Sequence, residues 1–165
     1  PPAAASGAAP SSLAFAGGDL VLGEILVVAP SPRDFVVIDD PLPAGLEAID
    51  ARLATSARSL DVDAAEAQAD ADADADVDQD DLRATGRAYE PSRFVREVRD
   101  DRVLFFVDHM AAGMYRYRYL ARATTLGAFV VPPARAEEMY SPEVFGRTGA
   151  LAVKVGSRDA APRPR

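Results

Sequence analysis

Residues 114–125 read MYRYRYLARATT, and this stretch decides the fold because its side chains alternate in character. In an extended chain, residues i and i+2 lie on the same side. One side would carry three tyrosines and two alanines: Tyr115, Tyr117, Tyr119, Ala121 and Ala123. The other side would carry a mainly basic set: Met114, Arg116, Arg118, Leu120 and Arg122. A helix would mix the two sets, so the alternation predicts a long half-buried strand with its aromatic face inward.

Apolar segments before and after this stretch indicate further strands, with turn signals rich in Pro, Gly and Asp between them. The expected strands cover residues 20–28, 35–38, 46–49, 93–98, 102–107, 129–131 and 151–155. Gly23 is a candidate β-bulge. The pattern also predicts a turn at 108–113, one helical turn at 134–139 and a loop at 140–146. Short strands with almost no helix signal predict an all-β fold, an antiparallel β-sandwich of about seven to eight strands.

Composition divides the chain into one domain and three segments without expected structure. Residues 1–17 are expected to be disordered because Pro, Ala, Ser and Gly dominate their first part. Residues 18–156 form the β-sandwich, interrupted by a long disordered acidic loop at 54–88, and residues 157–165 form a polar tail. Within the loop, residues 61–81 hold ten acidic side chains and no basic one, so the net charge of −8 leaves −8 − (−10) = +2 elsewhere.

The chain has no cysteine and one histidine, which excludes disulfides, a cysteine nucleophile and zinc–thiolate sites. No apolar run approaches the roughly 20 residues of a membrane helix, so no transmembrane segment is expected. The first residues lack an initiator methionine and a signal peptide, which favours a piece of a longer protein.

Three patterns invite a chemical interpretation, and each has a simpler one. Asp70, Asp72, Asp74 and Asp81 have EF-hand spacing, but Ala75 replaces the required glycine, so a solvated acidic loop is favoured over a calcium site. Asp108 beside His109 suggests acid–base chemistry, but adjacent strand residues point to opposite faces, which favours a turn histidine.

The third pattern is the basic stripe of Arg116, Arg118 and Arg122, which would suit an anion or nucleic acid. No aromatic side chain shares that face to stack on bases, so no nucleic-acid partner is expected. Glu97, Asp100, Asp101 and neighbouring strands can supply counter-charges. A solvated sheet face or a contact with another domain is the favoured interpretation.

Met139 and Tyr140 follow a Pro-Pro pair and are predicted to lie in a loop. Exposed apolar side chains in a loop often mark a contact site. The same two residues could instead cap the open end of the core. The residue pattern alone leaves these two alternatives equal.

Five groups of short motifs follow one another along the chain: DDPLPAGL at 39–46, DDRV at 100–103, GMYRY at 113–117 with ARAT at 121–124, VVPPA at 130–134 with AEEMY at 136–140, and VFGR at 144–147. In this order and spacing they resemble the C-terminal, receptor-binding-like macroglobulin domain of the bacterial alpha-2-macroglobulin family. The resemblance covers about residues 18–155 without the acidic insert, which departs from the family pattern. It implies a macroglobulin-like, fibronectin-III-like β-sandwich.

The resemblance also implies a role in a large protease trap, in which an internal Cys–Gln thioester of another domain bonds the protease. Because this chain has no cysteine, that thioester lies elsewhere in the parent protein. In bacterial members an aromatic residue of the last domain shields the thioester from water. The matching position here is Tyr140, with Met139 beside it.

The sequence therefore predicts a non-catalytic domain of a protease inhibitor that packs against the thioester domain and meets target proteases through the parent. No nucleophile–base–orienter set can be assembled, and neither cofactor nor metal is expected. The resemblance implies a periplasmic or extracellular location, with lipid anchoring through an upstream region left open. The alternative is a generic extracytoplasmic β-sandwich that binds a protein or carbohydrate partner through its loops. A Cys-x-Glu-Gln motif upstream of this chain would decide in favour of the macroglobulin domain.

Overall fold

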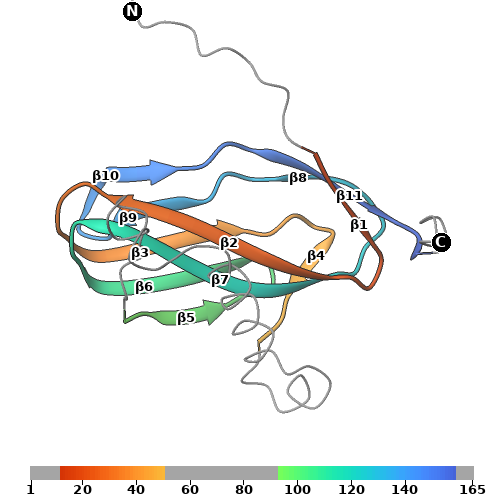
Figure 1. The fold of residues 1–165 in the computed structure, drawn as a ribbon, viewed down its shortest axis with the longest axis horizontal. Coiled ribbons are helices and arrows are strands. Elements are labelled where there is room, and N and C mark those ends of the chain that lie inside the picture. Colours follow the sequence, from red (N-terminus) through yellow and green to blue (C-terminus); the bar gives the residue numbers. More distant parts are fainter. Residues whose placement is uncertain (1–11, 51–92, 159–165) are drawn as a thin grey trace, which may run out of the picture.

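The computed structural model describes residues 12–50 and 93–158, and every regular element in these two ranges is a strand (Figure 1). The described residues form eleven strands in three sheets, so the all-β prediction is confirmed, whereas the expected count of seven to eight is too low. The acidic loop at 54–88 and its candidate calcium ligands lie outside the described residues.

The largest sheet has five antiparallel strands. In spatial order they are β10 (Ser141–Arg147), β9 (Arg135–Glu138), β3 (Arg33–Pro41), β6 (Arg102–Met110) and β5 (Val95–Val98). Strands β5 and β6, both expected from the sequence, form a hairpin, and the Arg99 N–H donates to the Arg102 carbonyl at 2.9 Å across its turn. This sheet is one layer of the sandwich.

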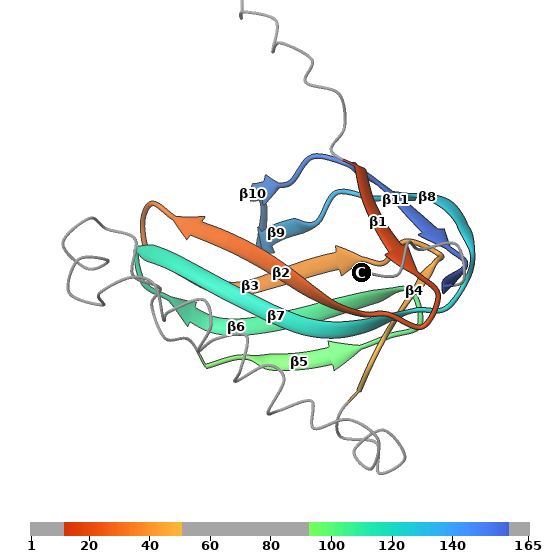
Figure 2. The same ribbon diagram turned by 45° about the vertical axis from the view of Figure 1, so that its right-hand side comes forward.

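The second layer is a three-stranded antiparallel sheet that crosses the first (Figure 2). Its strands, in spatial order, are β2 (Leu20–Ala29), β7 (Gly113–Ala123) and β4 (Leu46–Ala48). Strand β7 is the tyrosine stretch and lies at the centre of this layer. Its pairing with β2 runs without interruption from the Leu20–Arg122 pair to the Ala29–Gly113 pair.

A third sheet joins the first and last described strands. Its members, in spatial order, are β1 (Ser12–Ala16), β11 (Leu151–Gly156) and β8 (Gly127–Val131). Strand β1 pairs with β11 in parallel, and the Gly17 N–H extends the contact by donating to the Gly156 carbonyl at 2.8 Å. The expectation that residues 1–17 lack structure is therefore wrong for Ser12–Ala16, where backbone pairing orders a small, weakly apolar segment.

The tyrosines of β7 form the core between the two main layers, as the alternation predicts. Tyr115 and Tyr117 have 2% and 0% of their surface exposed, and the Tyr117 ring centroid lies 5.2 Å from that of Phe105 on β6. Burying large aromatic surfaces in this way is the main favourable term in folding. The inward aromatic face of the central strand is confirmed.

Gly23 is not a bulge, because the β2–β7 register passes through it unchanged. Its role is to leave room for an aromatic ring. A Cβ atom at this position would lie 2.3 Å from Cζ of Tyr119, which is well inside van der Waals contact. The glycine therefore allows the Tyr119 ring to cross the neighbouring strand.

Two segments differ from their predicted structure. Strand β6 continues to Met110, so the turn expected at 108–113 is confined to the two residues between β6 and β7. The expected helical turn and loop at 134–146 are instead the β9–β10 hairpin, because β9 pairs with β3 through Ile38–Ala136 and its neighbours. Pairing with an available sheet edge overrides the weak local preference of an Ala-Glu-Glu segment for helix.

Candidate functional site

The candidate site predicted from the sequence, Met139 and Tyr140, is the turn that joins β9 to β10. Tyr140 has 78% of its surface exposed and Met139 has 48%. The structure therefore places both side chains on the surface and does not use them to cap the core. Large apolar groups exposed together in this way are typical of contact surfaces.

Phe35, near the start of β3, belongs to the same surface. The centroids of the Phe35 and Tyr140 rings lie 5.3 Å apart with an interplanar angle of 88°, which is an edge-to-face pair. The Met139 N–H also donates to the Phe35 carbonyl at 2.8 Å. We call these three residues, Phe35, Met139 and Tyr140, the tip patch. Sequence reasoning missed Phe35 because it lies about a hundred positions earlier in an apolar run that reads as ordinary strand.

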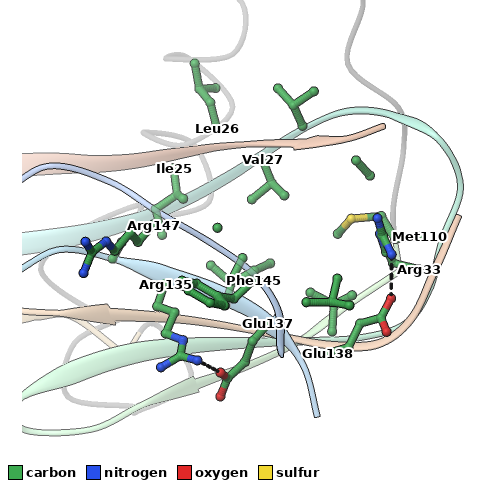
Figure 3. A pocket seen from close by; sticks show the side chains of 18 of the residues that line it. Ile25, Leu26, Val27, Arg33, Met110, Arg135, Glu137, Glu138, Phe145 and Arg147 are labelled. Atoms are coloured by element: carbon green, nitrogen blue, oxygen red, sulfur yellow. Dashed lines mark hydrogen bonds and ion pairs between the residues drawn. The ribbon is translucent and has the colours of Figure 1, made fainter. Parts of the chain in front are cut away.

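A cavity of about 370 Å³ lies between β2 and the β9–β10 hairpin (Figure 3). Its lining includes Ile25, Val36, Met110 and Phe145, which give it an apolar character. It lies at an edge of the sandwich, where β2 ends one layer and β10 ends the other. Only the folded arrangement of these two edge strands creates it, so no local sequence pattern indicates it.

Charged side chains beside this cavity pair with one another (Figure 3). Arg33 Nη1 lies 3.4 Å from Glu138 Oε1, and Arg135 Nη2 lies 2.6 Å from Glu137 Oε2. The Arg135 guanidinium also lies over the Phe145 ring, 4.6 Å from its centroid. Such pairs orient the β9–β10 hairpin but contribute little net stability because solvent screens them.

A buried polar pair links the two main layers. The Tyr119 hydroxyl of β7 donates to Asp40 Oδ2 of β3 at 2.7 Å. Burial raises the pKa of Asp40 above its ordinary value, and the hydrogen bond from Tyr119 opposes that rise. Burial and the adjacent Asp40 charge also raise the pKa of Tyr119. With both groups enclosed in the core, this pair fixes how the layers meet.

Asp108 and His109, the suggested acid–base pair, lie in strand β6, so the predicted turn histidine is wrong in its location. His109 Nδ1 lies 2.7 Å from Oδ1 of Asp34, its partner in the neighbouring strand β3. Both side chains are about two-thirds exposed. A solvated cross-strand pair of this kind is an ordinary sheet contact.

The basic stripe of β7 is held by contacts within the domain. Arg118 Nε lies 2.8 Å and Arg116 Nε 3.8 Å from Oε2 of Glu24 on the adjacent strand β2. Arg122 donates to the Gly18 carbonyl at 3.3 Å. The neighbouring strand β2 thus supplies the counter-charge of the stripe, as expected, and the residue that does so is Glu24. Two of the acidic residues named from the sequence have other partners: Glu97 pairs with Arg99, and Asp101 pairs with Arg102.

No group of three or more His, Cys, Asp or Glu side chains in residues 12–50 and 93–158 is arranged to hold a metal ion. In the same part of the chain there is no helix with the length and apolar character of a membrane span.

The family model and a curated relative that this chain matches both belong to the alpha-2-macroglobulins. Residues 3–143 match the model of the bacterial alpha-2-macroglobulin MG10 domain. An alpha-2-macroglobulin homolog of Nostoc sp. is 34% identical over 137 residues, which cover 80% of this chain and 6% of that protein.

Two solved structures have the same fold. Trypsin-activated alpha-2-macroglobulin from Escherichia coli aligns with a TM-score of 0.64 and 27% identity, covering 85% of this chain and 9% of that one. Salmonella alpha-2-macroglobulin reacted with methylamine aligns with a TM-score of 0.56 and 26% identity, covering 87% and 8%. The chain therefore spans less than a tenth of the length of these relatives.

Proposed function

The chain belongs to the MG10 domain family of bacterial alpha-2-macroglobulins, and from this premise we propose that it is a non-catalytic domain of a protease-trapping inhibitor. Its partner is the thioester domain of the parent protein. Target proteases are bound by the parent protein as a whole. The parent is periplasmic or extracellular. The family match favours this function over a generic β-sandwich that binds protein or carbohydrate.

The observation that carries the proposal is the exposure of the Met139–Tyr140 turn. Both side chains extend from a hairpin whose strands are fixed in the five-stranded sheet, so the turn is a rigid apolar projection. A thioester survives in a folded protein when water and amines are kept away from it. An apolar projection that docks over such a bond would exclude both.

The energy of this docking suits a shield that must be released. Covering roughly 100–200 Å² of apolar surface contributes a few kcal/mol at about 25 cal/mol per Å². That amount holds the shield in the native state, and a conformational change elsewhere in the parent can overcome it. The lack of cysteine in this chain agrees with a thioester that lies in one domain and is covered by another.

The test uses the full-length parent protein with Tyr140→Ala. Methylamine attacks the thioester carbonyl, forms an amide and releases the cysteine thiol, so thiol release gives the rate of attack. We expect this rate to rise by about tenfold or more, which corresponds to loss of about 1.4 kcal/mol of protection. Val130→Ala is the matched control, because Val130 is an apolar residue of β8 with 67% of its surface exposed. Equal rates for Tyr140→Ala, Val130→Ala and the unmodified protein would contradict the shielding role.

A further inference from the structure

Phe35 has a backbone conformation that its side chain disfavours. Its φ angle is 52°, and it is the single non-glycine residue with positive φ in residues 12–50 and 93–158. This left-handed region is uncommon for bulky L-residues because Cβ approaches the backbone. Residues held there persist only when their surroundings impose the conformation, and they concentrate at functional sites.

The pairing of β3 with β6 does not require this conformation. The Asp34–His109 pair precedes Phe35, the Val36–Val107 pair follows it, and the register is the same on both sides. The exposure of Phe35 follows the alternation of the strand, in which Val36, Ile38 and Asp40 are buried and the residues between them are less buried. Asp34 would be buried by the same alternation but is exposed, so the alternation ends at the residue before Phe35.

Phe35 makes two contacts with the tip. The Phe35 ring meets the Tyr140 ring edge to face, with 5.3 Å between the centroids. The Phe35 carbonyl accepts the Met139 N–H at 2.8 Å, which continues the β3–β9 register beyond the Val36–Glu138 pair. One residue therefore holds the backbone of one turn residue and the side chain of the next. Tyr140 would otherwise project into solvent from a two-residue turn with its rotamers free.

We propose that Phe35 is a positioning residue that preorients Tyr140 for docking against the thioester domain. This inference rests on the shielding function proposed above. An aromatic ring fixed before docking loses less conformational entropy when it is covered, so the same buried area gives a tighter shield. The left-handed backbone at Phe35 is the local cost of aiming its ring at Tyr140.

The experiment measures thiol release by methylamine in the full-length parent for four variants: Phe35→Leu, Phe35→Tyr, Tyr140→Ala and the double variant Phe35→Leu/Tyr140→Ala. Loss of the ring pair in Phe35→Leu is expected to raise the rate about threefold to tenfold. Phe35→Tyr keeps an aromatic edge and face, so its rate should stay near that of the unmodified protein. The double variant should match Tyr140→Ala alone, because Phe35 acts only through Tyr140.

Phe145→Leu is the matched control, since Phe145 is an exposed phenylalanine of the same hairpin that contacts Arg135. It should leave the rate unchanged. Phe35→Asn separates positioning from folding, because asparagine tolerates the left-handed conformation. Its melting temperature should equal or exceed that of the unmodified protein while its methylamine rate rises.

The outcomes distinguish the two proposals. If Tyr140→Ala raises the methylamine rate and Phe35→Leu leaves it unchanged, the positioning role of Phe35 is overturned and the shielding role of Tyr140 stands. If the double variant reacts with methylamine faster than Tyr140→Ala, the positioning role is also overturned, because Phe35 would then act independently of Tyr140. An unchanged Tyr140→Ala overturns shielding, and the positioning role is rejected with it.

Discussion

The central strand and the tip of the β9–β10 hairpin use tyrosine in opposite ways. Tyr117 has none of its surface exposed and packs on Phe105, whereas Tyr140 has 78% exposed and packs on Phe35. The first tyrosine holds the two layers together, and the second contributes little to the core. The difference teaches that an aromatic residue of this domain can serve the core or the surface: those of the core hold the layers together, and those of the tip are the ones we propose for contact with another domain.

The largest expected effect tests this division directly. Tyr117→Ala should lower the free energy of unfolding by about 3–5 kcal/mol, because it leaves a large cavity in the core. Tyr140→Ala, its matched partner, should change it by less than about 1 kcal/mol, as is usual for surface substitutions. Urea unfolding of the 165-residue chain measures both values. Similar losses for the two variants would erase the distinction between core and tip.

A second pair of variants tests the space that the core reserves for Tyr119. Gly23→Ala places a Cβ against the Tyr119 ring and should cost about 1–3 kcal/mol through overpacking. Gly146→Ala is the control, since an added Cβ there meets nothing within 4 Å. Melting temperatures of the two variants give the comparison. A neutral Gly23→Ala would mean that the ring can move aside in spite of its hydrogen bond to Asp40.

The buried pair between the layers should show which partner matters more. Tyr119→Phe leaves the Asp40 carboxylate without its donor and should cost about 1–2 kcal/mol at neutral pH. Asp40→Asn keeps an acceptor for the Tyr119 hydroxyl and removes a buried charge, so it should preserve or raise stability. Chemical unfolding at pH 7 decides between them. A greater loss of stability for Asp40→Asn than for Tyr119→Phe would contradict the expectation that burying the Asp40 charge is the main cost at this site.

The smallest effect is the pH dependence of the same pair. Because burial raises the folded-state pKa of Asp40, its contribution is most favourable below the ordinary pKa of 3.8 and declines as pH rises through the folded-state value. The stability of the unmodified chain minus that of Asp40→Asn should therefore fall with increasing pH across this window. Unfolding curves at several pH values give the difference. A difference that rises with pH would indicate a lowered pKa instead.

The sequence predicted the core better than the tip, and the reason is physical. The alternation in β7 reports which side chains face inward, so the burial of Tyr115, Tyr117 and Tyr119 could be predicted from it. The Ala-Glu-Glu segment of β9 carries no such signal and becomes a strand only because β3 offers it a free edge.

The surroundings of the candidate site were predicted in part. Met139 and Tyr140 were expected in an exposed loop and lie in an exposed turn, but the strands on either side of that turn were not expected. Phe35 could not be found, because it lies about a hundred positions before Tyr140 and meets it only in the folded chain. Its positive φ angle also has no signal in an apolar run of residues. The cavity between β2 and β10 was missed for a similar reason, since it exists only where the edges of two layers meet.

The most direct test of the account asks whether the tip is covered in the parent protein. Hydroxyl-radical footprinting with mass spectrometry measures the oxidation of Met139 and Tyr140 in the native full-length macroglobulin and after methylamine treatment. If the tip is covered, both residues show low oxidation in the native state and a clear rise after treatment, while Tyr117 stays protected throughout. Oxidation of Tyr140 in the native parent as strong as in the separate 165-residue chain would contradict it.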